Sequence, residues 1–221
     1  MEKLKLGPRL EAVASFVNME GSVADVGTDH GYVPVWLLQN GIRGSVIASD
    51  LNELPLEKAR QTAREYGYEA DISFRLCAGL ADIRASEADT VVIAGMGGET
   101  IRTILEESGW YFAGKRLVLQ PMTKRHELLR WLYEAGFHLS GEKFAEESGT
   151  VYRIFCAEWG RQTLPRPAHL WGGFTYTAYA EKQRKKLNRA LKGLKLASEP
   201  DFARIAEYEE VLEDLQHAYD R

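Results

Sequence analysis

The residues best suited to do chemistry stand in one short turn, Asp25-Val-Gly-Thr-Asp-His-Gly31. A dinucleotide-binding turn has the spacing G-x-G-x-x-G, in which backbone amides face a pyrophosphate. Asp25 and Asp29 would repel a pyrophosphate at close range, so this turn favours a ligand that carries positive charge. S-adenosylmethionine fits, because it has a sulfonium and an ammonium group and no phosphate. The alternative is an ordinary glycine turn in which an exposed Asp caps the next helix.

Further candidates follow apolar runs that we predict to be neighbouring strands. A carboxylate such as Asp50, at the end of the second run, can accept both hydroxyls of an adenosine ribose. Three glycines within Gly95–Gly98 suggest that the backbone there approaches a ligand closely, since an ordinary strand-to-helix turn seldom needs three. All the candidates fall on one edge of the predicted sheet: Asp50, Leu51, Gly79, Leu80, Gly95–Gly98, Gln120 and Pro121.

The elements that must position these residues alternate between short apolar runs and helical patterns. We predict strands at 22–27, 45–50, 72–77, 90–94 and 116–120, then two more at 138–145 and 151–158. Helices are predicted at 8–18, 31–40, 52–66, 98–108 and 123–135, with Asn52 and Thr123 as caps. The order β-α-β-α with a closing hairpin predicts a doubly wound, three-layer α/β sheet.

The composition changes near residue 160. Residues 160–173 hold two prolines and three glycines and are typical of a linker or a docked irregular segment. Apolar residues then recur every three or four positions over 176–197 and 199–221, with Pro200 in the first turn of the second helix. We predict a first domain at 1–160, and a linker with a coiled-coil-like antiparallel helical hairpin at 161–221.

The two predicted helices of the hairpin carry opposite charge. Residues 176–197 hold seven basic side chains against one acid, and residues 199–221 hold eight acids against two arginines. One interpretation is that the helices attract one another. The other is a basic ridge for RNA phosphates, with Lys185, Lys186, Arg189 and Lys192 as candidates. The two roles are compatible.

Overall composition narrows the class of protein. The chain has 221 residues, is 45% hydrophobic and carries a net charge of −4, so it can bury a core and does not coat nucleic acid uniformly. Its two cysteines cannot form a disulfide framework or a four-ligand zinc site, and we expect no metal. No stretch approaches 18 apolar residues and the start lacks a secretory pattern. We expect a soluble cytoplasmic protein with no membrane contact and no obligate protein partner.

Four features resemble one family, the bacterial tRNA (adenine-22-N1)-methyltransferases known as TrmK. They are the turn with its continuation to Pro34, Ala94-Gly-Met-Gly-Gly98, Leu119-Gln-Pro121 and the C-terminal hairpin. The resemblance covers nearly the whole chain. It implies a Rossmann-like class I methyltransferase domain, an extension that helps to hold tRNA, and methylation of adenosine 22 at N1 with S-adenosylmethionine.

By position, the resemblance assigns Asp25, Gly27 and Gly31 to the cofactor turn and Asp50, with Leu51 beside it, to the ribose. It assigns the pair Gly79 and Leu80 to the adenine side of the cofactor.

On the substrate side, the resemblance makes Gly95 to Gly98 the floor beneath the methyl group and the target base, with Gly95 on the cofactor side and Met96, Gly97 and Gly98 toward the substrate. Gln120 and Pro121 are substrate candidates too. Two positions depart from the family. Ala78 stands where relatives often carry Asp, and Met122 stands where many have Asn, so neither side chain offers that polar contact.

Adenine N1 has an in-plane lone pair, so it can attack the sulfonium methyl without a strong base. The site must align the reacting atoms and stabilise the positive charge that appears on adenine. Asp29 is the candidate for that catalytic role; contact with only the methionyl ammonium, or a helix cap, are the alternatives. Tyr32 could stack on a flipped base or belong to the core, and His30 could be a helix cap or an active-site donor.

Three rival functions remain compatible with parts of the pattern. One is a class I methyltransferase that acts on another RNA or on a small molecule, although the exocyclic-amine enzymes usually carry Asn/Asp-Pro-Pro-aromatic after the fourth strand. The acidic turn disfavours a nicotinamide-dependent oxidoreductase. The intact Asp25, Gly27, Gly31 and Asp50 disfavour a non-catalytic RNA-binding protein with a relic pocket.

Overall fold

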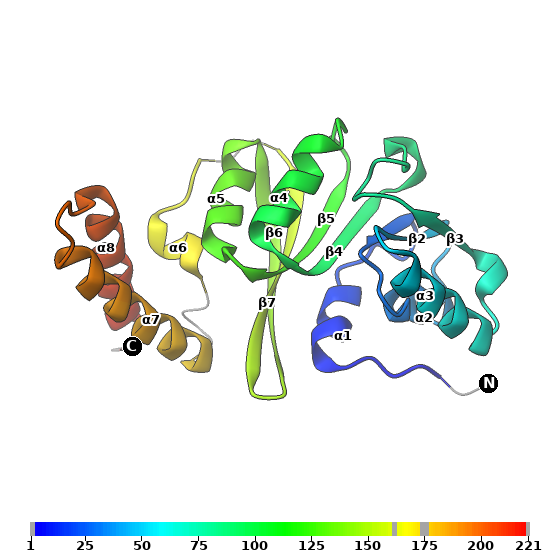
Figure 1. Ribbon diagram of the computed structural model, residues 1–221, viewed down its shortest axis with the longest axis horizontal. Helices are drawn as coiled ribbons and strands as arrows, with labels where there is room; N and C mark the ends of the chain where they lie inside the picture. Colours follow the sequence, from blue (N-terminus) through cyan, green and yellow to red (C-terminus); the bar gives the residue numbers. More distant parts are fainter. Residues whose placement is uncertain (1–2, 161–162, 173–176, 220–221) are drawn as a thin grey trace. The chain divides into compact units, whose positions relative to one another are not determined.

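The computed structural model, which describes residues 3–160, 163–172 and 177–219, contains a seven-stranded sheet of order β3-β2-β1-β4-β5-β7-β6 (Figure 1). Strands β1 to β5 are parallel, and β7 lies antiparallel between β5 and β6. The predicted α/β sheet with its closing hairpin is therefore confirmed. The strands are β1 (Val23–Val26), β2 (Val46–Asp50), β3 (Ile72–Leu76), β4 (Thr90–Gly97), β5 (Arg116–Thr123), β6 (Phe137–Glu147) and β7 (Thr150–Trp159).

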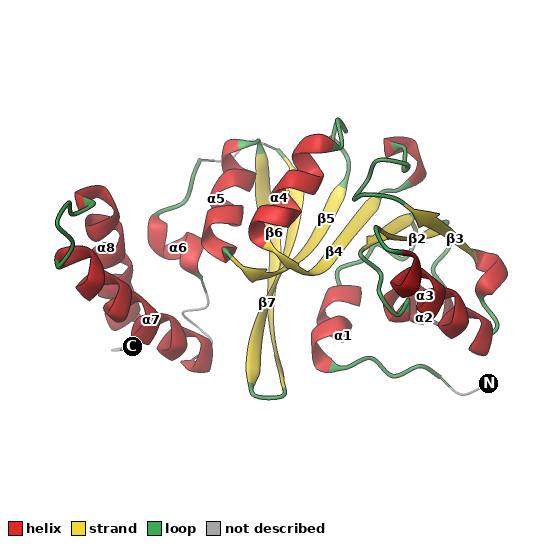
Figure 2. Ribbon diagram, viewed as in Figure 1, coloured by secondary structure: helices red, strands yellow, loops and turns green. Residues whose placement is uncertain are grey.

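Helices cover both faces of the sheet (Figure 2). They are α1 (Pro8–Ala14), α2 (Tyr32–Gln39), α3 (Glu53–Glu65), α4 (Gly98–Glu107) and α5 (Arg125–Glu134). In β4, Val92 packs in one core cluster with side chains of α1, α2 and α3, while Val91 and Ile93 alternate to the opposite face and are also fully buried. On that opposite face α4 and α5 pack against each other and against β4, β5 and β6. Burial on two sides explains why these strands are continuous apolar runs.

The order of the strands reverses between β1 and β4. From β1 the chain proceeds outward through β2 and β3, and it then returns to the other side of β1 with β4. In doubly wound sheets a ligand binds at the carboxyl ends of the strands at this point. The predicted turn at residues 25–31 and the Gly95–Gly98 segment both lie there.

Strands β4 and β5 extend three residues beyond the predicted ends, so Gly95–Gly97 belongs to a strand and not to a turn. Irregular pairing between Ala94 and Met96 marks a bulge, and Gly95 has φ 79°, which glycine adopts without strain. The bulge bends the backbone of the strand where the predicted cofactor edge begins.

Several predicted helix ends are wrong. Helix α1 stops at Ala14 instead of residue 18. Thr123, the predicted cap of the fifth helix, is instead the last residue of β5, and the residue that precedes α5 is Lys124, in a left-handed conformation. Asn52 does precede α3, but its side chain makes no capping hydrogen bond, and its amide N–H donates to Asp50 Oδ1 at 2.9 Å instead. The capping roles predicted for Asn52 and Thr123 are therefore not found.

Contacts divide the chain into two units, residues 1–162 and 163–221, next to the boundary predicted after residue 160. The second unit contains α6 (Pro167–Trp171), α7 (Thr177–Lys195) and α8 (Phe202–Tyr219). Helices α7 and α8 pack together through a small core that includes Leu187 and Val211. The predicted positions 161–162, 173–176 and 220–221 lie outside the described residues.

Two features of the second unit differ from the prediction. The predicted linker contains helix α6, which packs against α8. Helix α8 begins at Phe202 after Asp201, whose Oδ1 accepts the Arg204 N–H at 3.0 Å, so Pro200 lies before the helix. Among the described residues, none of the helices is both long and apolar enough to cross a bilayer.

Candidate active site

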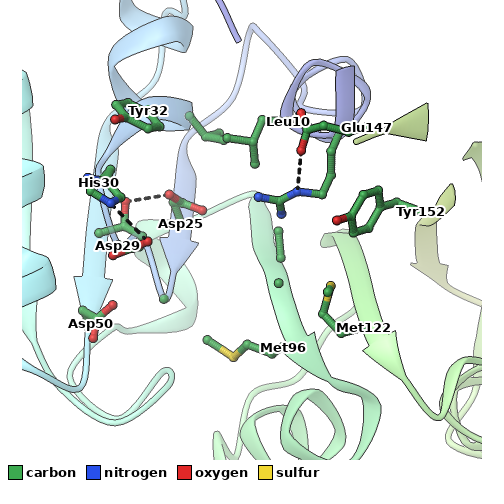
Figure 3. A pocket seen from close by; sticks show the side chains of 16 residues that line it. Leu10, Asp25, Asp29, His30, Tyr32, Asp50, Met96, Met122, Glu147 and Tyr152 are labelled. Atoms are coloured by element: carbon green, nitrogen blue, oxygen red, sulfur yellow. Dashed lines mark hydrogen bonds and ion pairs between the residues drawn. The ribbon is translucent and has the colours of Figure 1, made fainter. Parts of the chain in front are cut away.

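A cavity of about 510 Å³ opens at the carboxyl ends of β1, β2 and β4 (Figure 3). A volume of this size is typical of small-ligand pockets. Its lining contains seven of the predicted site residues: Asp25, Gly27, Asp29, Tyr32, Asp50, Gly95 and Met96. Three carboxylates that are separated by up to 25 residues in sequence therefore share one cavity.

Asp25 is the buried carboxylate of this site. It is 5% exposed and accepts a hydrogen bond from the Thr28 hydroxyl at 2.7 Å. Burial raises the pKa of Asp25 from 3.8 to about 6; the Thr28 hydrogen bond opposes this change and the negative charge of Asp50 adds to it. A carboxylate held at this cost is favourably placed to receive a cation.

Asp29 and His30 follow in the same turn, and neither side chain caps α2. The residue that precedes α2 is Gly31, and no side chain makes a capping hydrogen bond there. Asp29 has φ 51°, a conformation uncommon for residues other than glycine, and its side chain is 61% exposed. His30 Nε2 lies 3.6 Å from Asp29 Oδ2, and the His30 ring stacks on Tyr32 with centroids 5.2 Å apart and planes at 9°. The backbone thus presents Asp29 to the cavity, and the stacked rings stand beside it.

Two glycines of the turn have different reasons to be glycine. Gly27 has φ 74°, and a Cβ there would clash with Met96 Cε, so a side chain would be strained and would displace another cavity residue. Gly31 does not line the cavity. A Cβ on Gly31 would lie 2.9 Å from the Ala59 Cβ, so this glycine lets α2 approach α3 closely.

Asp50 ends β2 and lines the cavity with one carboxylate oxygen uncommitted. Its Oδ1 accepts the Asn52 N–H at 2.9 Å, and within the described residues Oδ2 has no protein partner. Leu51, which follows, is 66% exposed and stands outside the cavity lining. The structure thus leaves an acceptor at the end of β2 with an exposed apolar side chain beside it.

Several other residues predicted for the first unit do not line the cavity. Gly79 packs against Ile104 and Leu80 is buried at 2% exposure. Gly98 needs its lack of a side chain because it lies against the backbone of Thr123 and Lys124, between β5 and α5: a Cβ would lie 2.6 Å from the Lys124 carbonyl oxygen. Others outside the lining are Gly97, Gln120 and Pro121.

Gln120 is buried behind the cavity wall and acts on other residues. It is fully buried, and its Oε1 accepts hydrogen bonds from the Gly95 N–H at 3.1 Å and from Arg9 Nη1 at 3.0 Å. Its Nε2 donates to Met122 Sδ at 3.4 Å. In this structure it is therefore placed to hold Gly95 and Met122, two lining residues, rather than to touch a substrate.

Sequence reasoning missed the part of the lining that comes from distant elements. Arg9 and Leu10 come from α1, Glu147 from the end of β6 and Tyr152 from β7. No local motif surrounds them, because only the docking of α1 on the β6–β7 hairpin brings them to the cavity. Thr28, by contrast, stands inside the recognised turn and could have been included.

Comparisons with known proteins agree with this geometry. Residues 6–155 match the family model described as a methyltransferase domain. The chain is 37% identical over 161 residues to the tRNA (adenine(22)-N(1))-methyltransferase of Bacillus subtilis. This match covers 72% of this chain and 68% of that protein. The chain belongs to this methyltransferase family.

Solved structures of the family cover both units of the chain. The crystal structure of B. subtilis TrmK superposes with a TM-score of 0.84 at 28% identity, covering 98% of this chain and 99% of that one. The structure of Streptococcus pneumoniae Sp1610 in complex with S-adenosyl-L-methionine gives a TM-score of 0.81 at 33% identity, covering 94% and 100%. The resemblance deduced from the sequence is thereby confirmed.

The two positions expected from the sequence to depart from the family pattern fall in different places. Met122 lines the cavity and is 39% exposed, so it gives this wall an apolar surface. Ala78 is exposed and outside the lining, and Asp82, a possible replacement for the missing acid, is outside it too.

The family's helical extension presents its basic residues to solvent here. Lys185, Lys186, Arg189 and Lys192 are all exposed on α7. Lys185 pairs with Glu181 of its own helix at 3.4 Å, while Lys195 and Glu209, 2.6 Å apart, join α7 to α8. Among the described residues, ion pairing between the two helices therefore accounts for few of these cations.

Proposed function

We propose that this chain transfers the methyl group of S-adenosylmethionine to N1 of adenosine 22 in tRNA. The observation that carries the proposal is the gathering of three carboxylates, Asp25, Asp29 and Asp50, in one cavity at the strand-order reversal. Such a lining favours a cation and disfavours a diphosphate. The B. subtilis relative is a methyltransferase of that tRNA position, and the S. pneumoniae relative has been solved in complex with S-adenosyl-L-methionine.

The residues present fit that cofactor. The free oxygen of Asp50 is an acceptor for ribose hydroxyls, and the exposed Leu51 beside it offers an apolar surface to the adenine. Asp25 provides negative charge for the ammonium and sulfonium groups, and Gly27 keeps the backbone accessible. When bound, the cofactor supplies an electrophilic methyl group.

The protein's task in methyl transfer is alignment and charge stabilisation. A bond forms between adenine N1 and the methyl carbon as the methyl–sulfur bond breaks, so positive charge appears on the adenine. The lone pair of N1 makes a strong base unnecessary. Asp29, which the left-handed turn presents to the cavity, stabilises the charged base, and His30 Nε2 lies 3.6 Å from its carboxylate.

The target base must leave its pairing partner before N1 can react. The stacked pair of His30 and Tyr32 stands at the cavity, and Tyr32 is 38% exposed although it opens helix α2. An exposed aromatic surface beside the cavity is suited to stack on an extruded adenine. The exposed cations of α7 then bind tRNA phosphates, since few of them are engaged in ion pairs with α8 among the described residues.

Mapping the modified nucleotide tests this proposal. The enzyme is incubated with labelled S-adenosylmethionine and an unmodified tRNA pool, and reverse-transcription stops are mapped, because a methyl group on N1 blocks pairing. We expect label in tRNA and a new stop at adenosine 22. Label in another RNA, or stops at another position, would contradict the proposed specificity, and no transfer at all would contradict the activity.

A further inference from the structure

The cavity has a second charged centre, on the wall across from the carboxylates. Figure 3 shows Glu147 and Tyr152 on the far side of the cavity from Asp29 and Asp50. Arg9 joins this wall: its Nε lies 3.6 Å from Glu147 Oε2, and its guanidinium carbon lies 5.5 Å from the centroid of the Tyr152 ring. Three distant elements thus assemble one arginine site.

Counting hydrogen-bond donors shows that the guanidinium has capacity left for a ligand. Of its five N–H groups, one on Nη1 donates to Gln120 Oε1 at 3.0 Å. The Nε contact with Glu147 is longer than a hydrogen bond, and within the described residues Nη2 has no partner. The side chain is 24% exposed and lines the cavity. It is therefore held in place from behind, by Gln120, with donors still free.

We propose that Arg9 binds the phosphate next to the target adenosine. This inference rests on the proposed function and deepens it. An arginine would repel the adenine that becomes positively charged, so the group it can bind in the substrate nucleotide is the anionic phosphate. The cofactor brings a second anion, its methionyl carboxylate, and a loss of S-adenosylhomocysteine affinity in Arg9→Ala would assign the guanidinium to that carboxylate and overturn the phosphate assignment. The Gln120 bond and the Tyr152 ring fix the guanidinium, and Glu147 is the partner that a phosphate displaces.

The proposal predicts the direction in which a change at Glu147 alters the KM for tRNA. If the pair with Arg9 were merely structural, loss of the Glu147 charge would leave tRNA binding unchanged or weaken it. If Glu147 competes with a phosphate, Glu147→Gln should lower the KM for tRNA, by about two- to fivefold for a pair that is one-third exposed. The matched control is Glu20→Gln, which removes the carboxylate of the exposed Arg43–Glu20 pair outside the cavity and should leave the KM unchanged.

The direct test combines an arginine variant with a modified RNA. Arg9→Ala should raise the KM for tRNA about 10- to 100-fold, the range for a lost charge-assisted hydrogen bond, with S-adenosylhomocysteine affinity within twofold of wild type. Arg43→Ala is the control. Two modified tRNAs, with a methylphosphonate in place of the phosphate 5′ or 3′ of adenosine 22, remove that negative charge. With one of them the KM of the wild-type enzyme should rise by a similar factor, whereas the KM of Arg9→Ala should not rise further.

Each outcome bears on one claim. If the effects of Arg9→Ala and of the methylphosphonate on KM multiply, the phosphate assignment is wrong. Full activity of the wild-type enzyme on both methylphosphonate RNAs would also overturn it, and this result does not depend on whether Arg9→Ala folds. An inactive wild-type enzyme on unmodified tRNA would instead overturn the proposed function.

Discussion

The cavity and helix α7 use charge in opposite ways. In the cavity, Asp25 is buried and its pKa is raised, so its charge is costly, and one glycine-bearing turn places both it and Asp29. On α7, Lys186, Arg189 and Lys192 are exposed and solvated, so each costs little and contributes little. Function in the cavity is therefore concentrated in single residues, whereas function on α7 is distributed over a surface. The predictions below test this contrast.

The largest effect is expected from Asp29→Ala. Loss of the carboxylate that stabilises the charged adenine should slow methyl transfer about 10²- to 10³-fold, while S-adenosylmethionine affinity changes only modestly. Single-turnover rates with saturating cofactor measure this. Asp71→Ala, which removes an exposed carboxylate outside the cavity, is the matched control. An unaltered single-turnover rate would remove Asp29 from the catalytic role.

Next in size is the combined change of Lys185, Lys186, Arg189 and Lys192 to Glu. It should weaken tRNA binding about 10²-fold at low salt, and the difference should shrink as salt rises, because counterion release contributes less. The matching Gln set should give a smaller loss, and cofactor affinity should stay constant in both. Filter binding across a salt series measures this. If the Glu variant binds tRNA as tightly as the wild type, the basic residues serve only the structure of the hairpin.

A smaller effect is expected from Asp50→Asn. Loss of the charged acceptor at the end of β2 should weaken S-adenosylmethionine binding about tenfold, with the rate at saturating cofactor close to that of wild type. Calorimetric titration combined with single turnover separates the two. A change in rate without a change in affinity would argue against a ribose contact.

The subtlest prediction concerns Asp25→Asn, which should stabilise the ligand-free protein. The raised pKa, about 6 against 3.8, means that the folded state binds this proton more tightly than the unfolded chain. The free energy of unfolding that Asp25 contributes therefore falls as pH rises from about 4 to about 6. Near pH 7 the Asn variant should gain up to about 2–3 kcal/mol while its cofactor affinity drops.

Denaturant titrations of wild type and Asp25→Asn from pH 4 to pH 7 provide the measurement. The difference in stability should grow through that window and then level off. A constant difference would show that the carboxyl is not desolvated in the ligand-free protein.

Local sequence could predict Asp25, Asp29 and Asp50 because each lies at the end of a short apolar strand, and parallel strands bring their carboxyl ends to one edge. It could not predict Arg9 or Tyr152, which reach the cavity only through the docking of α1 on the β6–β7 hairpin. The same limit applies to strand length in β4, where the bulge at Gly95 continues a strand past its apolar run.

Gln120 shows a further limit of strand-end reasoning. Its position at the carboxyl edge places it near the cavity, but its side chain is fully buried, where it bonds to the lining residues Arg9, Gly95 and Met122. Proximity along the chain indicates which edge a residue occupies, and the packing decides whether it touches a ligand or holds another residue.

The central claim is that the carboxylate wall of the cavity, formed by Asp25, Asp29 and Asp50, selects a cationic cofactor and rejects a dinucleotide's diphosphate. Calorimetric titration of the wild-type protein with S-adenosylmethionine and with NAD tests it most directly. The account predicts saturable one-to-one binding of S-adenosylmethionine and no detectable heat of binding from NAD at the same concentrations. Saturable binding of NAD, with S-adenosylmethionine unable to compete, would contradict it.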